Sequence, residues 1–534
     1  MRDRSREQTP ESGDPSLGWS QGGGLTEPSQ AGHRKPAEST TCAAVVTSLE
    51  STDSVMAGLF GRDSTYMVLW VLQLIGAALV TPFVTRLVSP TQFGVISSAN
   101  ALMQVLFAIA SCGMVTAIQR RYAGVAGPEM AARLLALSFM VVAVVMAVAF
   151  VSSGLWIDAL GLAPERPTVL LATLWAGVSA VTSSLLAYLR SQDRLGAFSA
   201  VSLIQSVVAE VVSLALVARV ANTATAFVAG QLAAQVVAAA ASLLFVRPRL
   251  LRKSDRALVT STLAFAVPLL PATLGAFVLN AADRLMLQGI VDAEAVARYQ
   301  VAYNIGSLPM LVLGALHSAW LPRFFQVADE KKREAALADS SAALFRLLPP
   351  VMLGLACGSP ILLRLWAPGA FHPDGLGLVT ALIVVTAVAY TGQLAASRAL
   401  LARGRSRVIA TATVAAASVN IALNVVLIPW DGVMGAALAT FISYGLLWVG
   451  LLIPTRRQRI RSNVTQIAVC SLAVVVTLLI ATTPLTPPLL AGRVVAALLS
   501  LGWFLLVLRR VMSESSKPAK AGAPPPRAPR TRRR

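Results

Sequence analysis

Long apolar runs separated by short polar segments dominate the chain from about residue 65 to residue 508. Each run holds roughly 20 residues or more, the length that an α-helix needs to cross about 30 Å of hydrocarbon. The alternating polarity of ~10-residue segments that indicates a transmembrane barrel is not evident. The pattern therefore predicts an all-α polytopic membrane protein that crosses a bilayer about fourteen times.

Two sets of six helices and one final pair are expected from the apolar runs. The first six span 65–86, 92–115, 132–153, 168–189, 196–218 and 222–246, and the next six span 260–290, 295–321, 340–365, 376–400, 406–428 and 433–454. The final pair spans 464–483 and 489–508, and the longest internal loop is expected over about 325–338.

Both ends of the chain are expected to be disordered, because they lack a periodic apolar pattern. Residues 1–62 are rich in Ser, Gly, Pro and Glu, and residues 511–534 form a Pro-rich basic tail. No apolar core follows the first basic residues, so a signal peptide is not predicted. Met56 opens a compact start, "MAGLFGRDSTYMVLW", and translation from Met56 rather than Met1 stays open.

Lys and Arg alternate between rich and sparse loops along the chain. The rich set includes the loop with Lys331 and the basic C-terminal tail, whereas the sparse set carries acidic residues such as Asp292 and Asp374. Cytoplasmic loops carry the excess of Lys and Arg, so the rich set is assigned to the cytoplasm. Both termini are then cytoplasmic, which requires an even number of helices.

An internal repeat is indicated by two similar segments. "TRLVSPTQFGVISSANALMQ" and "DRLMLQGIVDAEAVARYQVAYN" each begin with an Arg-Leu pair near the predicted outer surface. Six helices separate the copies, so both have the same membrane orientation. The repeat predicts two parallel lobes, residues 63–247 and 248–456, followed by an extra helix pair over 457–510.

Three segments carry a resemblance to a known family. "TPFVTRLVSPTQFG", "AVPLLPATLGAFVLNAADRLML" and "NIALNVVLIPWDGVMGAALATFISY" resemble the first, the seventh and the joined eleventh and twelfth helices of polysaccharide biosynthesis proteins of the O-antigen flippase type. The resemblance covers about residues 65–455. It identifies the chain as a member of the multidrug/oligosaccharidyl-lipid/polysaccharide (MOP) exporter superfamily.

This resemblance implies two six-helix lobes around a central cavity and transport by alternating access. It implies a lipid-linked saccharide as substrate, carried on a diphosphate lipid from the inner to the outer leaflet of the plasma membrane, with H⁺ or Na⁺ as a possible coupling ion. A lipid II flippase and a cation-coupled multidrug exporter of the same superfamily remain alternatives. A membrane enzyme is less favoured, because such enzymes generally need a large outer loop and every outer loop here is short.

Charged residues inside membrane helices are costly, so each is a candidate site residue. Asp283 and Arg284 lie in the outer half of the seventh helix, with Asn280 one turn before Arg284. A guanidinium group matches phosphate or carboxylate oxygens, which makes Arg284 a candidate for substrate binding. The alternative is that the pair holds neighbouring helices together.

Three further residues are candidates on other helices. Glu210 is the only acidic residue deep in a helix of the first lobe, and we expect ion coupling or a hydrogen bond to a neighbouring helix. Arg86 would guide substrate outward or anchor the first helix at the headgroups. Arg120 would capture a diphosphate on the cytoplasmic side, although the positive-inside bias alone also explains it.

The composition and the absence of known motifs argue against several other classes of function. Only 13% of the 534 residues are charged, and the formal net charge is +20. The sequence has no P-loop, no HExxH motif and no nucleotide-binding pattern, so neither catalysis nor a cofactor or metal is expected. The basic tail is assigned to contact with membrane lipids rather than with nucleic acid.

Overall fold

The computed structural model describes residues 80–124, 127–252, 255–314, 317, 330–455, 464–484 and 486–515. The predicted N-terminal tail, including Met56, lies outside these residues, as does the C-terminal tail beyond Ser515. Residues 511–515 were predicted to begin the disordered C-terminal tail, whereas they continue the last helix of the structure. The described residues form helices and connecting turns, with no strand among them. This agrees with the predicted all-α fold, since a helix satisfies its backbone hydrogen bonds without water.

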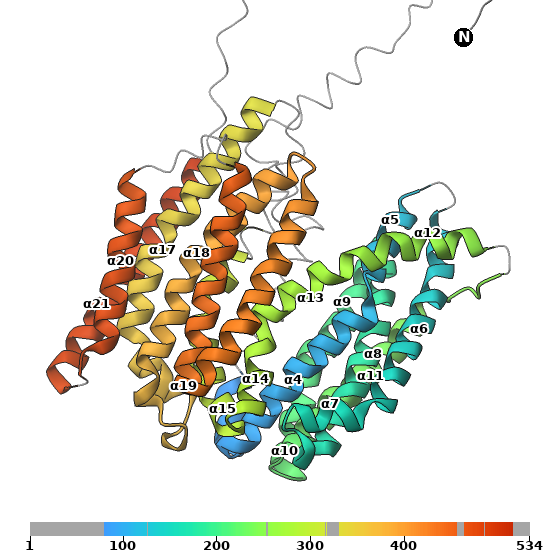
Figure 1. Cartoon of the computed structure of the whole chain (residues 1–534), viewed down its shortest axis with the longest axis horizontal. Helices are drawn as coiled ribbons and strands as arrows, with labels where there is room; N and C mark the ends of the chain where they lie inside the picture. The colour runs from blue at the N-terminus through green and yellow to red at the C-terminus, as the bar shows by residue number, and fades with distance from the viewer. Residues whose placement is uncertain are drawn as a thin grey trace, which may run out of the picture. The chain divides into compact units, whose positions relative to one another are not determined.

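The first half of the chain, up to Phe245, begins with a helical end over residues 80–87. It continues with α4 (Pro90–Ser111), α5 (Met114–Tyr122), α6 (Gly127–Val151), α7 (Ser153–Ala159), α8 (Arg166–Ser191), α9 (Leu195–Leu203), α10 (Ala209–Arg219) and α11 (Ala224–Phe245). A π-helical turn, Ile204–Val208, joins α9 to α10. Figure 1 shows these helices in blue to green.

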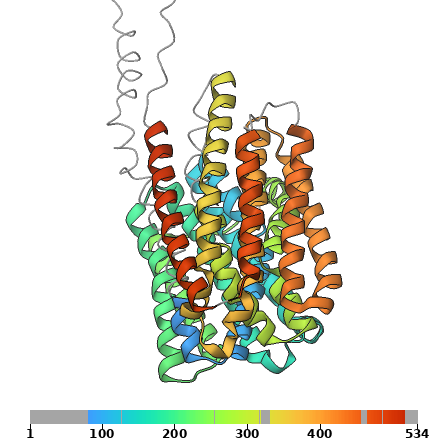
Figure 2. The same cartoon turned by 90° about the vertical axis from the view of Figure 1, so that its left-hand side faces the viewer.

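The second half begins at Arg256. It contains α12 (Arg256–Ala266), α13 (Leu270–Phe277), α14 (Asp283–Ile290), α15 (Ala293–Gly306), α17 (Glu330–Trp366), α18 (Gly377–Leu401) and α19 (Ser406–Thr455). The chain then forms α20 (Val464–Thr482) and α21 (Pro487–Ser515), which are the predicted extra pair. Figure 2 shows α20 and α21 beside α17, which both of them contact.

Ten helices in the described part of the chain are long and apolar enough to cross a membrane. One of them, α19, contains two predicted spans, because the backbone leaves helical geometry at Asp431 and Gly432. Gly432 has a φ of 47°, which favours glycine, and the chain turns so tightly that a Cβ at Gly435 would lie 2.1 Å from the Leu427 carbonyl oxygen. The number of fourteen crossings stays a prediction.

Two predicted elements differ from the structure. Residues 330–338 belong to α17 rather than to a loop, because Glu, Lys and Ala are strong helix formers and continue the helix beyond its apolar part. The second predicted helix is broken at Cys112 and Gly113, which have φ values of 41° and 68°, so that α4 and α5 are separate.

The seventh predicted helix is interrupted twice. Val267–Leu269 forms a 3₁₀ turn that contains Pro268, and Pro271 follows in the first turn of α13. Proline removes a backbone donor and clashes with the preceding turn, which explains the break. A π-helical turn, Val278–Ala282, then joins α13 to α14.

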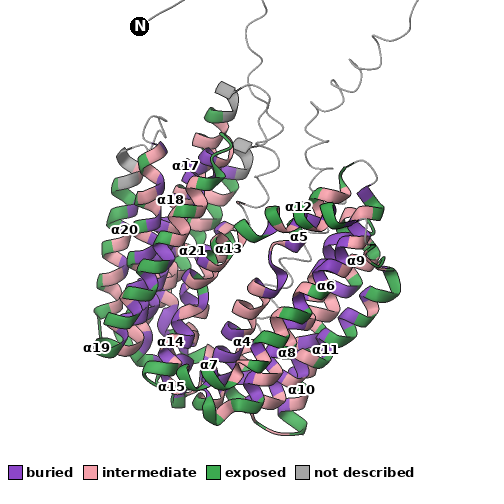
Figure 3. Cartoon of the chain, turned by 45° about the vertical axis from the view of Figure 1, so that its right-hand side comes forward, coloured by how far each residue is buried: buried purple, intermediate pink, exposed green. Residues whose placement is uncertain are grey.

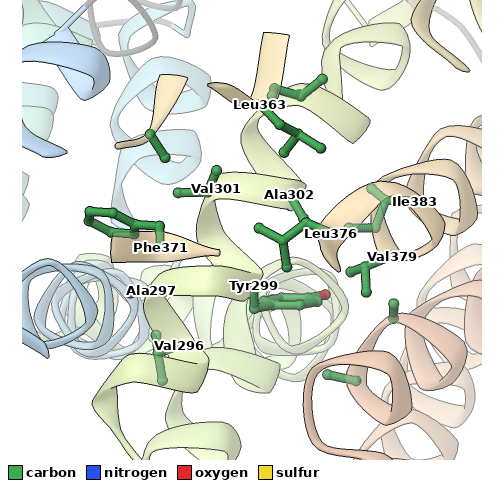
Figure 4. Packing of buried hydrophobic residues seen from close by; sticks show 14 of the residues in the cluster. Val296, Ala297, Tyr299, Val301, Ala302, Leu363, Phe371, Leu376, Val379 and Ile383 are labelled. Atoms are coloured by element: carbon green, nitrogen blue, oxygen red, sulfur yellow. The ribbon is translucent and has the colours of Figure 1, made fainter. Parts of the chain in front are cut away.

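Helix α15 lies in the largest buried cluster of apolar residues. Val296, Tyr299, Val301 and Ala302 are fully buried there, among side chains from α17 and α18 (Figure 4). Small residues allow close approach, as at Gly306, where a Cβ would lie 2.7 Å from Ile383. Small residues are the usual means of tight helix packing in a membrane.

Large apolar side chains are exposed along several helices. On α19, Val419, Ile421, Val425 and Val426 are examples, and Figure 3 shows exposed positions along this helix. A soluble protein would rarely expose such continuous apolar surface. These faces are suited to contact with lipid tails.

Candidate functional site

Asp283 and Arg284 form a buried ion pair at the start of α14. The Arg284 Nη1 and Asp283 Oδ1 atoms are 2.8 Å apart, and the two residues are 5% and 1% exposed. An isolated charge at this depth would be costly, so each charge needs a partner. The sequence left open whether these neighbours face different helices, and in the structure they pair with each other.

Residues of two other helices complete the environment of the carboxylate. The Tyr299 hydroxyl of α15 donates a hydrogen bond to Asp283 Oδ2. The Thr440 hydroxyl of α19 lies 3.4 Å from the same oxygen. The backbone N–H of Arg284 donates to Oδ1 over 3.0 Å. Asp283 therefore ties the seventh predicted helix to the eighth and twelfth.

The Arg284 guanidinium is held on several sides. Its Nε donates to Gln300 Oε1 over 3.0 Å, and Nη1 also donates to the Asn280 carbonyl oxygen. The Cζ atom lies 3.9 Å from the centroid of the Tyr303 ring and 5.3 Å from that of Tyr299. Rings at this distance attract a guanidinium through their negative faces.

Asn280 extends the polar network toward α19. Its side chain is exposed, and its Oδ1 accepts a hydrogen bond from Tyr444 over 3.2 Å. On the other side of Arg284, Gln300 Nε2 donates to Asn304 Oδ1 over 2.6 Å, and Asn304 lies 3.4 Å from the Thr81 hydroxyl. The network thus reaches from α19 to the end of the first helix.

Arg86 lies away from this network. Its Nη2 donates to the Leu365 carbonyl oxygen over 2.8 Å, and the adjacent Thr85 hydroxyl donates to the Trp366 carbonyl over 2.7 Å. These carbonyls are at the end of α17, where the last turn of a helix has no backbone partners. In the structure, Arg86 caps a helix.

Arg120 and Arg121 are in the last turn of α5 and line a cavity of about 500 Å³. The other side of the cavity is α12, which Figure 3 shows beside α5. The Arg120 guanidinium is stacked over the Phe265 ring at 4.5 Å from its centroid. Arg121 Nη2 donates to the Ser261 hydroxyl over 2.8 Å.

Glu210 is the second residue of α10, which begins directly after the π-helical turn Ile204–Val208. Its carboxyl is hydrogen-bonded to the Gln231 side chain of α11. Asp283 is the first residue after the other π-helical turn, Val278–Ala282. Single π-helical turns are rare and occur frequently at functional sites, so both acidic residues have the same unusual local setting.

The structure brings together Asn280, Asp283 and Arg284, and places Arg86, Arg120 and Glu210 in separate surroundings. The sequence analysis missed the partners Tyr299, Gln300, Tyr303, Thr440 and Tyr444. A signal was present in "YQVAYN", where Tyr299 and Tyr303, and Gln300 and Asn304, are four residues apart on one helix face.

Solved structures of two transporters share this fold. The lipid II flippase MurJ in an inward closed conformation matches 85% of this chain and 99% of its own, with a TM-score of 0.60 and 12% identity. An inward-facing multidrug resistance MATE family transporter of the MOP superfamily matches 73% of this chain and 96% of its own, with a TM-score of 0.60 and 13% identity. Comparison with curated protein sequences gives no match.

The helical fold and its apolar spans define a multi-pass membrane protein with the architecture of MOP superfamily transporters. The model of a family described as polysaccharide biosynthesis protein matches residues 83–367, which is more than half of the chain. The chain belongs to this polysaccharide biosynthesis protein family.

Proposed function

We propose that the protein is a flippase for a lipid-linked oligosaccharide. It carries the saccharide on its diphosphate lipid from the inner to the outer leaflet of the plasma membrane, for assembly of a cell-surface polysaccharide. Both termini are cytoplasmic, and the lobes 63–247 and 248–456 alternate in opening, with 457–510 as an added pair. Membership of a polysaccharide biosynthesis family supports the substrate class.

The observation that carries the transport mechanism is the close contact between α4 and α15. A Cβ at Gly94 would lie 1.7 Å from the Ala293 carbonyl oxygen, so the two backbones touch. The two helices come from different halves of the chain, and the contact is at their N-terminal ends, which the charge count assigns to the outside. A substrate cannot leave between them unless they separate.

Further contacts extend this closure at the same predicted side. Ser98 donates to Gln288 Oε1 over 3.0 Å, which joins α4 to α14. The turn after α7 meets the end of α14 at two glycines, where a Cβ at Gly161 would lie 3.2 Å from Gly289. The cavity beside Arg120 is at the opposite, predicted cytoplasmic side. This arrangement suits a state that is closed outside and accepts substrate from inside.

Within this mechanism, Asn280, Asp283 and Arg284 of the second half form the polar site that contacts the saccharide or its diphosphate. Asn280 presents an exposed amide beside Arg284. Glu210 is the proton- or cation-binding residue that links transport to an ion gradient. Arg86 holds the outer end of the first helix at α17, as its hydrogen bonds indicate.

A reversible cross-link tests whether α4 and α14 separate during transport. The double variant S98C/Q288C, in a chain whose native cysteines are replaced, would be reconstituted into liposomes with a lipid-linked oligosaccharide. We expect oxidation to stop translocation and reduction to restore it. The matched control is T168C/T225C, because these hydroxyls are 2.8 Å apart within the first half and at the same predicted side.

Translocation at the unmodified rate by fully cross-linked S98C/Q288C would rule out this opening. Loss of transport in oxidised T168C/T225C would show that any cross-link is harmful. Replacing the oligosaccharide lipid by lipid II or by a cationic drug in the same liposomes separates the proposed substrate from the two alternatives within the superfamily.

A further inference from the structure

The cavity between α5 and α12 combines two cations with polar groups. Arg120 and Arg121 approach it from α5, and Ser261, Thr262 and Phe265 approach it from α12. Its volume of about 500 Å³ is within the range of small-molecule binding sites. The predicted orientation places it on the cytoplasmic side.

Both arginines are positioned without a carboxylate partner among the described residues. The Arg120 Cζ atom lies over the Phe265 ring, and the guanidinium donates no hydrogen bond to another described residue. Arg121 uses one Nη2 hydrogen bond to Ser261. A guanidinium has five N–H donors, so further donors remain for a ligand.

The nearby acidic groups are committed to other arginines. Glu129, at the start of α6, pairs with Arg249. Asp255, just before α12, lies 2.7 Å from Arg133 Nη1. The positive charge of Arg120 and Arg121 therefore has no compensation from these groups, and the cavity attracts anions.

Thr262 is a further polar residue in the lining of this cavity. The residue lines the cavity and is 3% exposed, and its Oγ1 has no hydrogen-bond partner among the described residues. A buried hydroxyl without a partner is costly, and native structures rarely retain one. A phosphate oxygen in the cavity would provide the acceptor.

We propose that this cavity binds the diphosphate group of the lipid-linked substrate before translocation, with Arg120 and Arg121 as its charged ligands and Thr262 as a hydroxyl donor. The inference rests on the proposed flippase function. Two guanidinium groups match the charge and the oxygen-rich edge of a diphosphate. Arg121 is also hydrogen-bonded to Ser261 of α12. A ligand bound to Arg121 would therefore lie against α12, close to the proline-containing break that follows this helix.

Binding to the full-length protein in phosphatidylcholine nanodiscs tests this site. The probes are inorganic pyrophosphate and a polyprenyl-diphosphate oligosaccharide, and their affinities are compared in wild type and R120Q/R121Q. Each charge-assisted hydrogen bond lost should weaken binding about tenfold, so we expect a loss of about 100-fold for both probes. The matched control is R405Q/R407Q, which removes two exposed cations from another loop of the predicted cytoplasmic set.

The variant T262V separates binding from folding. Valine replaces the unpartnered hydroxyl by a methyl group of similar size, so the unfolding temperature should stay the same or rise. Affinity for pyrophosphate should nevertheless fall about threefold to tenfold, the value of one neutral-donor hydrogen bond. A T262V variant that is less stable but binds normally would indicate a packing role and overturn the assignment.

The remaining outcomes distinguish this site from the function as a whole. Equal affinities of wild type and R120Q/R121Q for both probes would overturn the site. Weaker pyrophosphate binding with normal translocation by R120Q/R121Q would show that the cavity takes a free diphosphate instead of the substrate, which also overturns the inference but leaves the flippase intact. A wild-type protein that does not translocate the diphosphate-linked saccharide would overturn the proposed function itself.

Discussion

Tyr299 of α15 donates its phenolic hydrogen to the carboxylate of Asp283, which is the residue that pairs with Arg284. Both side chains are buried, and the bond joins two consecutive helices of the second half. A hydrogen bond to a buried charged group contributes about 1.5–3 kcal/mol to stability. Tyr299→Phe should lower the free energy of unfolding by this amount, as measured by thermal unfolding of the purified protein. Tyr390→Phe is the control, because its ring faces Tyr444 and donates no hydrogen bond to Asp283.

Arg284→Ala would leave the Asp283 carboxylate buried without its cation. Removing one partner of a buried pair costs about 3–5 kcal/mol, so the amount of folded protein should fall. The double variant D283N/R284M should recover much of it, because no charge remains buried. Translocation per folded molecule then tests the site, since a substrate-binding Arg284 predicts that the recovered double variant is inactive. Normal translocation by D283N/R284M would limit Arg284 to a structural role.

Arg284→Lys gives an intermediate expectation. The charge remains, but the planar fork that reaches Asp283, Gln300 and the Asn280 carbonyl is lost. We expect partial translocation per folded molecule, counted from lipid-linked precursor left in the inner leaflet. If the Lys and Ala variants translocate equally, keeping the positive charge has no effect, and the substrate does not recognise the charge alone.

Glu210→Gln should slow gradient-dependent export and leave the protein in the membrane. Glutamine keeps a hydrogen-bonding side chain opposite Gln231 but cannot bind or release a proton. The measurement is transport into liposomes with and without an imposed H⁺ or Na⁺ gradient. Asp431→Asn, at the reversal of α19, is the control for loss of one negative charge. An unchanged gradient response in Glu210→Gln would assign Glu210 to packing.

Two similar surface ion pairs test the orientation. Asp374 pairs with Arg364, and Glu334 pairs with Arg403, each at 2.7–2.8 Å with half-exposed carboxylates. The Lys and Arg count predicts Asp374 outside and Glu334 in the cytoplasm. A membrane-impermeant thiol reagent added to intact cells should label Asp374→Cys but not Glu334→Cys. Labelling of the second variant alone would invert the topology.

Low pH should reduce the stability that Asp255, directly before α12, contributes to the folded protein. The backbone N–H of Arg252 and the guanidinium of Arg133 hold the pKa of the Asp255 carboxyl below its ordinary value. A lowered folded pKa contributes stability that is present above the unfolded value of about 3.9 and is lost as the pH falls through the folded value. Asp255→Asn should therefore lower the unfolding temperature at neutral pH, and the difference from wild type should shrink in acid. A constant difference across this pH range would contradict the linkage.

The positions of the membrane helices could be predicted because burial in lipid requires long apolar runs. The beginning of α17 could not be predicted in this way. The segment from Glu330 to Asp339 contains several charged residues, and its helical state follows from helix propensity rather than from hydropathy. The break at Cys112 and Gly113 was also missed, because both residues fit an apolar run and only backbone geometry distinguishes them.

The candidate site shows a similar division. Asp283, Arg284 and Glu210 stand out in the sequence because ionisable groups in membrane helices are expensive. Tyr299, Tyr303 and Tyr444 do not, since aromatic residues also occur in apolar cores and only helix packing shows that they surround an ion pair. Arg86 was a candidate for the substrate path. Its hydrogen bond to the last turn of α17 could not be predicted, because it joins residues that are 279 positions apart in the sequence.

The hydrogen bonds made by Arg86 and Thr85 connect the end of the first predicted helix to the second half of the chain. Leu365 and Trp366 belong to the second half of the chain, and Asn304, which meets Thr81, belongs to it as well. The end of the first helix is thus fastened at three points to the half that follows it by more than 200 residues. If the two halves separate during transport, this segment either moves together with the second half or loses all three bonds in every cycle.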